Sequence, residues 1–229
     1  YSRKILPQII AAAEAAAKRT VAHPAALITA NYGKQVSFAE EMMNRSGCLA
    51  NCLDEWARRD IATTNDIFLF SVRAWDTDGR KNVDELKQAK ERGWQVVLFA
   101  SQAGMPKPAR ELGVDYLIDN GADTGTETGA VLNVAANIMN GWLWSCEYAA
   151  AMTRLGKHPG ILQSILTEGS DKHNAEVQQL TARNRQFDWN QPIARGALAE
   201  IYLNRVEQLK VCVESVFKDE DGKYKRRSF

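Results

Sequence analysis

The sequence is poor in the features that mark membrane, secreted and nucleic-acid-binding proteins. No apolar run reaches the roughly 18 residues that a membrane-spanning helix needs. The first residues lead into a helical pattern of Ala, Glu and Lys, and not into the cleavage site of a signal peptide. Lysine plus arginine number 29 and aspartate plus glutamate number 28, so the chain lacks the basic excess of a nucleic-acid binder. We therefore expect no membrane and no nucleic acid among its partners.

Cysteine is also scarce, with four residues in a chain of 229. Cys48 and Cys52 are closely spaced, but no second pair and no histidine cluster accompanies them, which argues against a zinc site. We interpret the four cysteines as reduced and mostly buried thiols. The expectation is a cytoplasmic protein that uses no metal and no cofactor.

The pattern of apolar residues predicts an α/β protein. Residues 5–19 have helical spacing, and residues 83–92 form a second helical pattern between two strand patterns. A strand, about ten helical residues and another strand make a βαβ crossover, which implies parallel pairing. The predicted strands are 25–30, 66–71, 94–101 and 114–119. Residues 49–59 fit either a further strand or an irregular helix.

The second half of the chain is predicted to be mostly helical. Long helical patterns run over 129–155, 171–185 and Ile193 to Phe217. We predict a three-layer sandwich, in which helices flank an open parallel sheet, followed by C-terminal helices. The α/β domain would span 1–185. A helical extension, 186–229, would pack on the domain or on a dimer partner.

Polar loops follow four of the predicted strands. In open parallel sheets, ligands bind outside the carboxyl ends of the strands, where backbone N–H groups and helix N-termini favour phosphate. The alternative is that these loops only connect the elements and cap the helices. The candidate substrate-binding residues are Asn31, Tyr32, Gly33, Ser71, Arg73, Thr77, Asp78, Gly79, Arg80, Asn82, Ser101, Gln102, Thr124, Thr126 and Thr128.

Several short segments, in this order, resemble the sugar isomerase (SIS) family. Residues 37–42, Ser-Phe-Ala-Glu-Glu-Met, resemble the helix after the first strand of phosphoheptose isomerases. Segments that resemble an uncharacterised phosphosugar-binding branch of the family are 44–49, 129–133, 158–164 and 169–174. The likeness covers about residues 1–185. It implies a flavodoxin-like SIS fold that binds a sugar phosphate and forms a homodimer or homotetramer.

Two residues are candidates for catalysis, the first of them through the resemblance. Glu41 matches the family's catalytic glutamate and would abstract a proton next to a carbonyl. His173 would be the partner acid, since an imidazole suits proton transfer near neutral pH. Each has a simpler interpretation. Glu41 would then be a helix residue stabilised by the helix dipole, and His173 a residue bonding locally at a helix N-terminus.

One departure from the family bears on the function. The family's Ser-x-Ser-Gly-x-Thr phosphate loop corresponds to residues 71–82, which keep Ser71 but lack the second serine. Arg73 or Arg80 would replace the lost contacts, because a guanidinium can bind phosphate through two parallel bonds. The sequence thus favours a sugar-phosphate isomerase or a related proton-transfer enzyme. The alternative is a non-catalytic sensor or regulatory protein that binds a sugar phosphate.

Overall fold

The computed structural model describes about three fifths of the chain. The described residues are 2–30, 38–39, 41–42, 52–54, 61–73, 75, 80–122, 125–157 and 190–204. In chain order the elements are α1 (Ser2–Ala22), β1 (Ile28–Ala30), β2 (Cys52–Asp54), β3 (Ile67–Ser71), α3 (Arg80–Glu91), β4 (Gln95–Ala100), α4 (Lys107–Glu111), β5 (Tyr116–Asp119) and α5 (Glu127–Arg154). A further helix covers 197–204.

The strands form an open parallel sheet in the order β2-β1-β3-β4-β5. Every neighbouring pair is parallel, with Ala30 opposite Leu69 and Ser71 opposite Phe99. The predicted α/β fold with an open parallel sheet is therefore confirmed, and residues 52–54 of the ambiguous segment are a strand. This order is that of flavodoxin-like sheets, in which the direction of winding reverses between the first and third strands.

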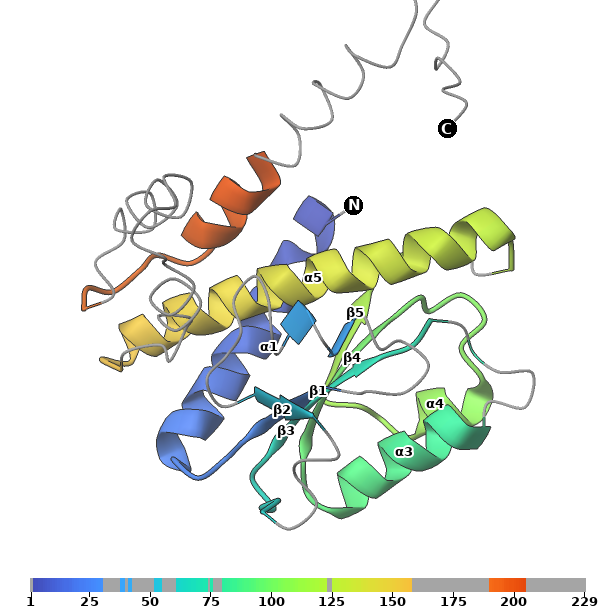
Figure 1. Ribbon diagram of the computed structural model, residues 1–229, viewed down its shortest axis with the longest axis horizontal. Helices are drawn as coiled ribbons and strands as arrows, with labels where there is room; N and C mark the ends of the chain where they lie inside the picture. Colours follow the sequence, from blue (N-terminus) through green and yellow to red (C-terminus); the bar gives the residue numbers. More distant parts are fainter. Residues whose placement is uncertain are drawn as a thin grey trace, which may run out of the picture.

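Helices cover both faces of the sheet (Figure 1). Because successive strand residues point to opposite faces, Ile67 and Leu69 join the core beneath α1 and α5, while Phe68 and Phe70 join the core beneath α3. A strand buried on both faces reads as an unbroken apolar run, which is why β3 and β4 stand out in the sequence. The result is three layers.

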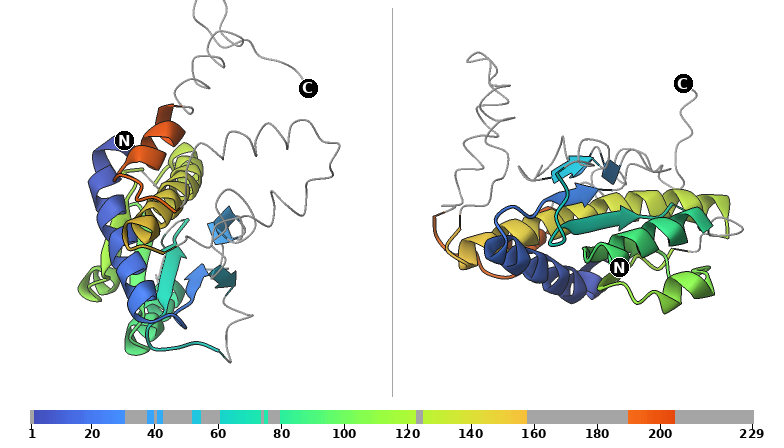
Figure 2. Two further views of the ribbon diagram at one scale, coloured as in Figure 1. Left: turned by 90° about the vertical axis from the view of Figure 1, so that its left-hand side faces the viewer. Right: turned by 90° about the horizontal axis from the view of Figure 1, so that it is seen from below.

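α1 and α5 pack side by side on one face of the sheet (Figure 2). α1 presents a stripe of small residues, and its Ala12, Ala13, Ala16 and Ala17 are fully buried. Small side chains let the two helix backbones approach closely. Trp144 and Tyr148 of α5 stack on each other in this layer, with ring centroids 5.4 Å apart. This packing fixes α5 on the sheet and so fixes the positions of the residues at its two ends.

Polar bonds close the amino edge of the sheet. Asp66, fully buried before β3, accepts hydrogen bonds from the backbone N–H groups of Leu27 and Thr63, at 2.9 and 2.8 Å. Arg19, near the end of α1, donates to the carbonyl oxygens of Thr64, Asn65 and Gly93. These bonds join the starts of β1, β3 and β4. The polar groups at this edge are therefore engaged in holding the fold.

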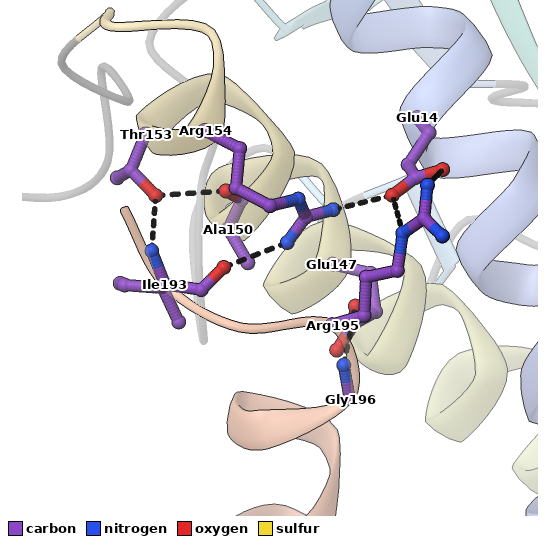
Figure 3. Close-up of polar contacts among 8 residues, drawn as sticks. All are labelled: Glu14, Glu147, Ala150, Thr153, Arg154, Ile193, Arg195 and Gly196. Carbon is purple, nitrogen blue, oxygen red and sulfur yellow. Dashed lines mark hydrogen bonds and ion pairs between the residues drawn. The ribbon is translucent and has the colours of Figure 1, made fainter. Parts of the chain in front are cut away.

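Residues 190–204 pack on α1 and α5 through apolar side chains, and polar contacts add to this packing (Figure 3). Here the predicted helix start at Ile193 is wrong, because the helix begins at 197. Ile193 donates its N–H to Thr153 Oγ1 at 2.9 Å, and its carbonyl accepts from Arg154 Nη1 at 2.8 Å. Gly196 then adopts a φ of 76°, outside the helical region. The rest of the predicted helix, 205–217, lies outside the described residues.

A buried carboxylate, Glu147 of α5, lies beneath this segment. It is 0% exposed, and its Oε2 accepts from the Gly196 N–H at 3.0 Å. Among the described residues, its Oε1 has no hydrogen-bond partner. Burial raises the pKa of Glu147 above its ordinary value of 4.5; the N–H groups of Gly196 and Ala199 and the charge of Arg154 lower it, and the charge of Glu14 adds to the rise. The net direction is upward, so ionised Glu147 opposes folding.

Glu147→Gln is expected to make the protein more stable at neutral pH. The glutamine oxygen can still accept from Gly196 without the cost of a buried charge. Because the pKa of Glu147 is raised in the folded state, its contribution to the free energy of unfolding is fully present below its unfolded-state pKa. This contribution is lost as pH rises through the folded-state pKa. The advantage of the variant should therefore be absent near about pH 4 and grow toward about pH 7, as measured by urea unfolding.

A matched control for this test is Glu111→Gln in α4. The Glu111 side chain is 63% exposed and pairs with exposed Lys107. Solvent screens such a pair, so its removal should change stability little at either pH. An equal gain for Glu147→Gln at both pH values would contradict a charge-dependent cost at Glu147.

Candidate functional site

The carboxyl ends of β3, β4 and β5 meet at one edge of the sheet. Because all strands are parallel, α3, α4 and α5 each begin at this edge after the strand before them. The winding reverses between β1 and β3, and this is the place where doubly wound sheets open a crevice for a ligand. The candidate site is this edge, called here the strand-end rim: residues 71–73, 75, 80–82, 101–105 and 119–126, as far as they are described.

Three buried asparagines fix the exit from β3. Asn137 Nδ2 of α5 donates to Ser71 Oγ at 3.1 Å and to the Val72 carbonyl at 3.2 Å. Asn133 Nδ2, one turn earlier, donates to the same carbonyl at 2.9 Å and also to that of Arg73. Asn120 Nδ2, after β5, donates to the side-chain oxygens of Asn133 and Asn137, at 2.5 and 2.6 Å. The chain leaving β3 is thereby attached to α5.

The exits from β4 and β5 are joined in the same way. Buried Ser101 donates from its Oγ to the Ala122 carbonyl. Asp119 Oδ1 accepts from the N–H groups of Gln102 and Gly121, at 2.9 and 3.0 Å. The indole N–H of Trp75 donates to the Ser101 carbonyl at 3.4 Å, which ties the loop after β3 to that after β4. The rim is therefore a backbone surface held by interior side chains.

Positive charge gathers where the helices start. α3 begins Arg80-Lys81, and no acidic residue occupies its first turn or that of α4. Cations at the positive end of a helix dipole are unfavourable unless an anion lies nearby. Arg73 is exposed, and its carbonyl is held by Asn133. The described part of the rim thus has the charge that an anion would neutralise.

The start of α5 has ordinary capping geometry. Thr126 is the N-cap, and its Oγ1 accepts from the Gly129 N–H at 3.0 Å. A hydroxyl in this position satisfies one of the free N–H groups of the first helical turn. The sequence left ligand binding and helix capping open for the loop that contains Thr126, and the structure shows that Thr126 caps α5. Thr128 lies in the first turn of the same helix, where its backbone alone is described.

The structure brings part of the predicted site together. Ser71, Arg73 and Ser101 belong to the rim described above, exposed Gln102 follows Ser101, and partly buried Asn82 lies in the first turn of α3, which begins at Arg80. The predicted residues that lie outside the described part of the chain are Asn31, Tyr32, Gly33, Thr77, Asp78, Gly79, Thr124 and His173.

Glu41 lies within the described residues, on a short segment that packs against α5. It is partly buried, and its neighbours Phe38 and Met42 pack on α5 at Gly141. Burial raises the pKa of Tyr202, and the charges of Cys146 and Glu41 add to that rise. The Tyr202 phenol therefore stays protonated at neutral pH. Burial also raises the pKa of the Cys146 thiol to about 12, so this cysteine is not a nucleophile at neutral pH.

Sequence reasoning missed the asparagines that hold the rim. Asn133, Asn137 and Asn140 recur at positions i, i+4 and i+7 of α5, so they share one helix face. Asparagine is a poor helix former, and three on one face of a long helix indicate buried hydrogen-bond partners. Asn140 does have one, since its Oδ1 accepts from Ser2 Oγ at 3.1 Å. This spacing was the signal available in the sequence.

Neither a protein-family model nor a curated protein matches the sequence. Within the described residues, no three His, Cys, Asp or Glu side chains gather as metal ligands would. The same part of the chain contains no helix that combines the length and the apolar character of a membrane span. What the described residues do define is a rim of fixed backbone with cationic side chains around it.

Proposed function

We propose that this chain binds a sugar phosphate at the strand-end rim, as a member of the SIS family. The observation that carries the proposal is the fixed exit of β3, which Asn133 and Asn137 hold beside the reversal between β1 and β3. A rigid backbone at such a reversal binds a ligand without a large cost in conformational entropy.

Phosphate is the part of the ligand that the rim best accommodates. Arg80 and Lys81 begin α3 with no acidic residue in the first turn, and Arg73 is exposed on the preceding loop. A dianionic phosphoryl group would receive backbone N–H bonds from the helix start and charge-assisted bonds from the guanidinium of Arg73. The negative charge of Asp119 at the same edge is partly offset by the two backbone N–H groups that bind its Oδ1.

The sugar, and the assembly of the protein, rest on the resemblance to the SIS family. The matching segments imply a phosphorylated sugar as ligand and a homodimer or homotetramer as the working form. Fold alone does not define a substrate, so these two parts of the proposal depend on the motifs.

A second candidate function is catalysis of proton transfer on that sugar phosphate. The observation that favours it is the position of Glu41 on a segment whose Phe38 and Met42 pack against α5, from where its charge contributes to the raised pKa of Tyr202. A carboxylate that is held in place can abstract a proton next to a carbonyl when the substrate lies within hydrogen-bond reach. Glu41→Gln should then abolish turnover and leave binding intact. A simple binding protein would show no turnover in either form.

A thermal-shift comparison of sugar phosphates with the same free sugars tests the proposal. A phosphorylated ligand at 100 times its dissociation constant should add about 2.7 kcal/mol of stability. Arg73→Ala should weaken that binding about tenfold, the value of one charge-assisted hydrogen bond to phosphate.

The control for this prediction is Lys87→Ala, on the same helix as Lys81. The Lys87 side chain is 61% exposed and pairs with Glu91 at i,i+4, so its loss removes one positive charge without touching the rim. If both variants weakened binding of the sugar phosphate equally, the loss would come from the change in overall charge and not from a contact at the rim. The absence of a shift with every sugar phosphate would refute the proposed function.

A further inference from the structure

A pocket of about 320 Å³ lies at the other end of α5 from the strand-end rim. Its lining comes from α1, from the last turn of α5 and from the segment before the helix at 197–204; the residues are Glu14, Lys18, Ala151, Arg154, Leu155 and Arg195. α5 has 28 residues, which at about 1.5 Å per residue separates its two ends by about 40 Å. The pocket is therefore independent of the rim.

One carboxylate in this pocket is shared by two guanidinium groups (Figure 3). Glu14 Oε1 accepts from Arg154 Nη2 at 2.7 Å and from Arg195 Nε at 2.6 Å, while its Oε2 accepts from Arg195 Nη2 at 3.0 Å. Burial would raise the pKa of Glu14, but the bonds and charges of Arg195 and Arg154 outweigh it and leave the pKa lowered. Glu14 therefore stays ionised and holds both guanidiniums in place.

The pocket nevertheless carries excess positive charge. Lys18, one turn after Glu14 on α1, is exposed and forms no ion pair or hydrogen bond with the described residues. The lining thus holds three cations, Lys18, Arg154 and Arg195, against the single carboxylate of Glu14. Buried Glu147 also lies near Arg154, but its raised pKa reduces its tendency to carry charge. An added anion would bring the lining closer to neutrality.

The end of α5 offers less opposition to an anion than a bare helix C-terminus would. Its last carbonyls accept capping bonds, from Leu155 to Ala151 at 3.1 Å, from Gly156 to Thr153 at 3.0 Å and from Lys157 to Met152 at 2.9 Å. Gly156 has a φ of 68°, which permits this cap. These bonds occupy the oxygens that carry the negative end of the helix dipole.

We propose that this pocket binds a small organic anion, with a carboxylate or phosphate group on a short apolar body. Lys18 and the outward edge of Arg195 contact the anionic group, since the Arg195 side chain is 68% exposed even while paired with Glu14. Ala151 and Leu155 supply an apolar wall for the body of the ligand. The volume is at the lower end of the range for small-molecule sites.

Binding of simple probes to the whole chain tests this inference. We expect hexanoate and phenyl phosphate to bind more tightly than acetate, inorganic phosphate or hexanol. Binding is measured by amide chemical shifts or by calorimetry, at constant ionic strength. Hexanoate and phenyl phosphate also distinguish a carboxylate from a phosphate preference. Lys18→Glu should weaken the preferred probe roughly tenfold, because it replaces an attraction by a repulsion in the lining.

Lys4→Glu on the same helix is the matched control, since Lys4 is exposed and does not line the pocket. It should leave the affinity unchanged. Equal losses for Lys18→Glu and Lys4→Glu, or no binding of either probe, would overturn the inference. So would a loss of probe binding in Arg73→Ala, because that result would place the probe at the strand-end rim.

Discussion

Asn137→Leu is expected to lower the free energy of unfolding by about 3 kcal/mol, the largest loss that we predict for one substitution in this chain. Leucine has nearly the same shape but removes three hydrogen bonds, to Ser71, Val72 and Asn120. Each is worth about 1 kcal/mol, and a buried group left without its partner costs more. The effect should be large because Asn137 is 0% exposed and water cannot replace the lost bonds.

Chemical denaturation of Asn137→Leu beside Asn204→Leu checks this prediction. Asn204 is exposed and accepts one bond from Arg3, so the same chemical change there should cost well under about 1 kcal/mol. Asn137→Leu should also weaken any ligand that binds at the strand-end rim, because only the bonds of Asn133 would then attach the exit of β3 to α5. Equal and small effects of the two substitutions would contradict the structural role of the asparagines.

Gly141→Ala is expected to destabilise the protein by about 2 kcal/mol, although alanine is the better helix former. An added Cβ at Gly141 would lie 2.8 Å from Phe38 Cε2 and 2.9 Å from Met42 Cε. Phe38 is itself fixed, since its ring packs on Phe99 with centroids 5.2 Å apart. The substitution therefore pushes the segment that carries Glu41 away from α5.

Two companion variants make this test specific. Ala135→Gly, at an exposed position of the same helix, should cost about 1 kcal/mol and so show the intrinsic preference for alanine. Met42→Ala combined with Gly141→Ala should cost less than the sum of the two single changes, because the smaller side chain makes room. Strict additivity, or a stabilised Gly141→Ala, would show that the close approach at Gly141 carries no cost.

Much of the fold could be predicted from the sequence because its signals are local. Residues 66–71 and 94–101 read as buried strands, and β3 and β4 fall within those limits. Helix boundaries were less exact: α3 begins at Arg80, before the apolar pattern at Val83, since its first three residues are polar and contribute no apolar periodicity. The helix predicted from Ile193 failed at its start because side chains of α5, remote in sequence, bind the backbone of Ile193.

The candidate site was less accessible to sequence reasoning. The rule that ligands bind at strand ends located Ser71 and Ser101, but not the asparagines that hold the backbone around Ser71. Similarly, Glu14, Arg154 and Arg195 meet only because α1, α5 and the segment at 190–196 pack together, and no short motif joins them. Contacts between remote segments require the topology first.

The side chains that hold the exit of β3 contain no group that titrates near neutral pH. Asn120, Asn133, Asn137, Ser71 and Ser101 are amides and alcohols, which neither gain nor lose a proton over the range in which proteins stay folded. The bonds that these five side chains make, among them those that hold the exit of β3, are thus unchanged across that range. A phosphate monoester, by contrast, gains its second negative charge near pH 6. An affinity for a phosphate monoester that follows this ionisation would therefore report the charge of the ligand, and not a change at the exit of β3.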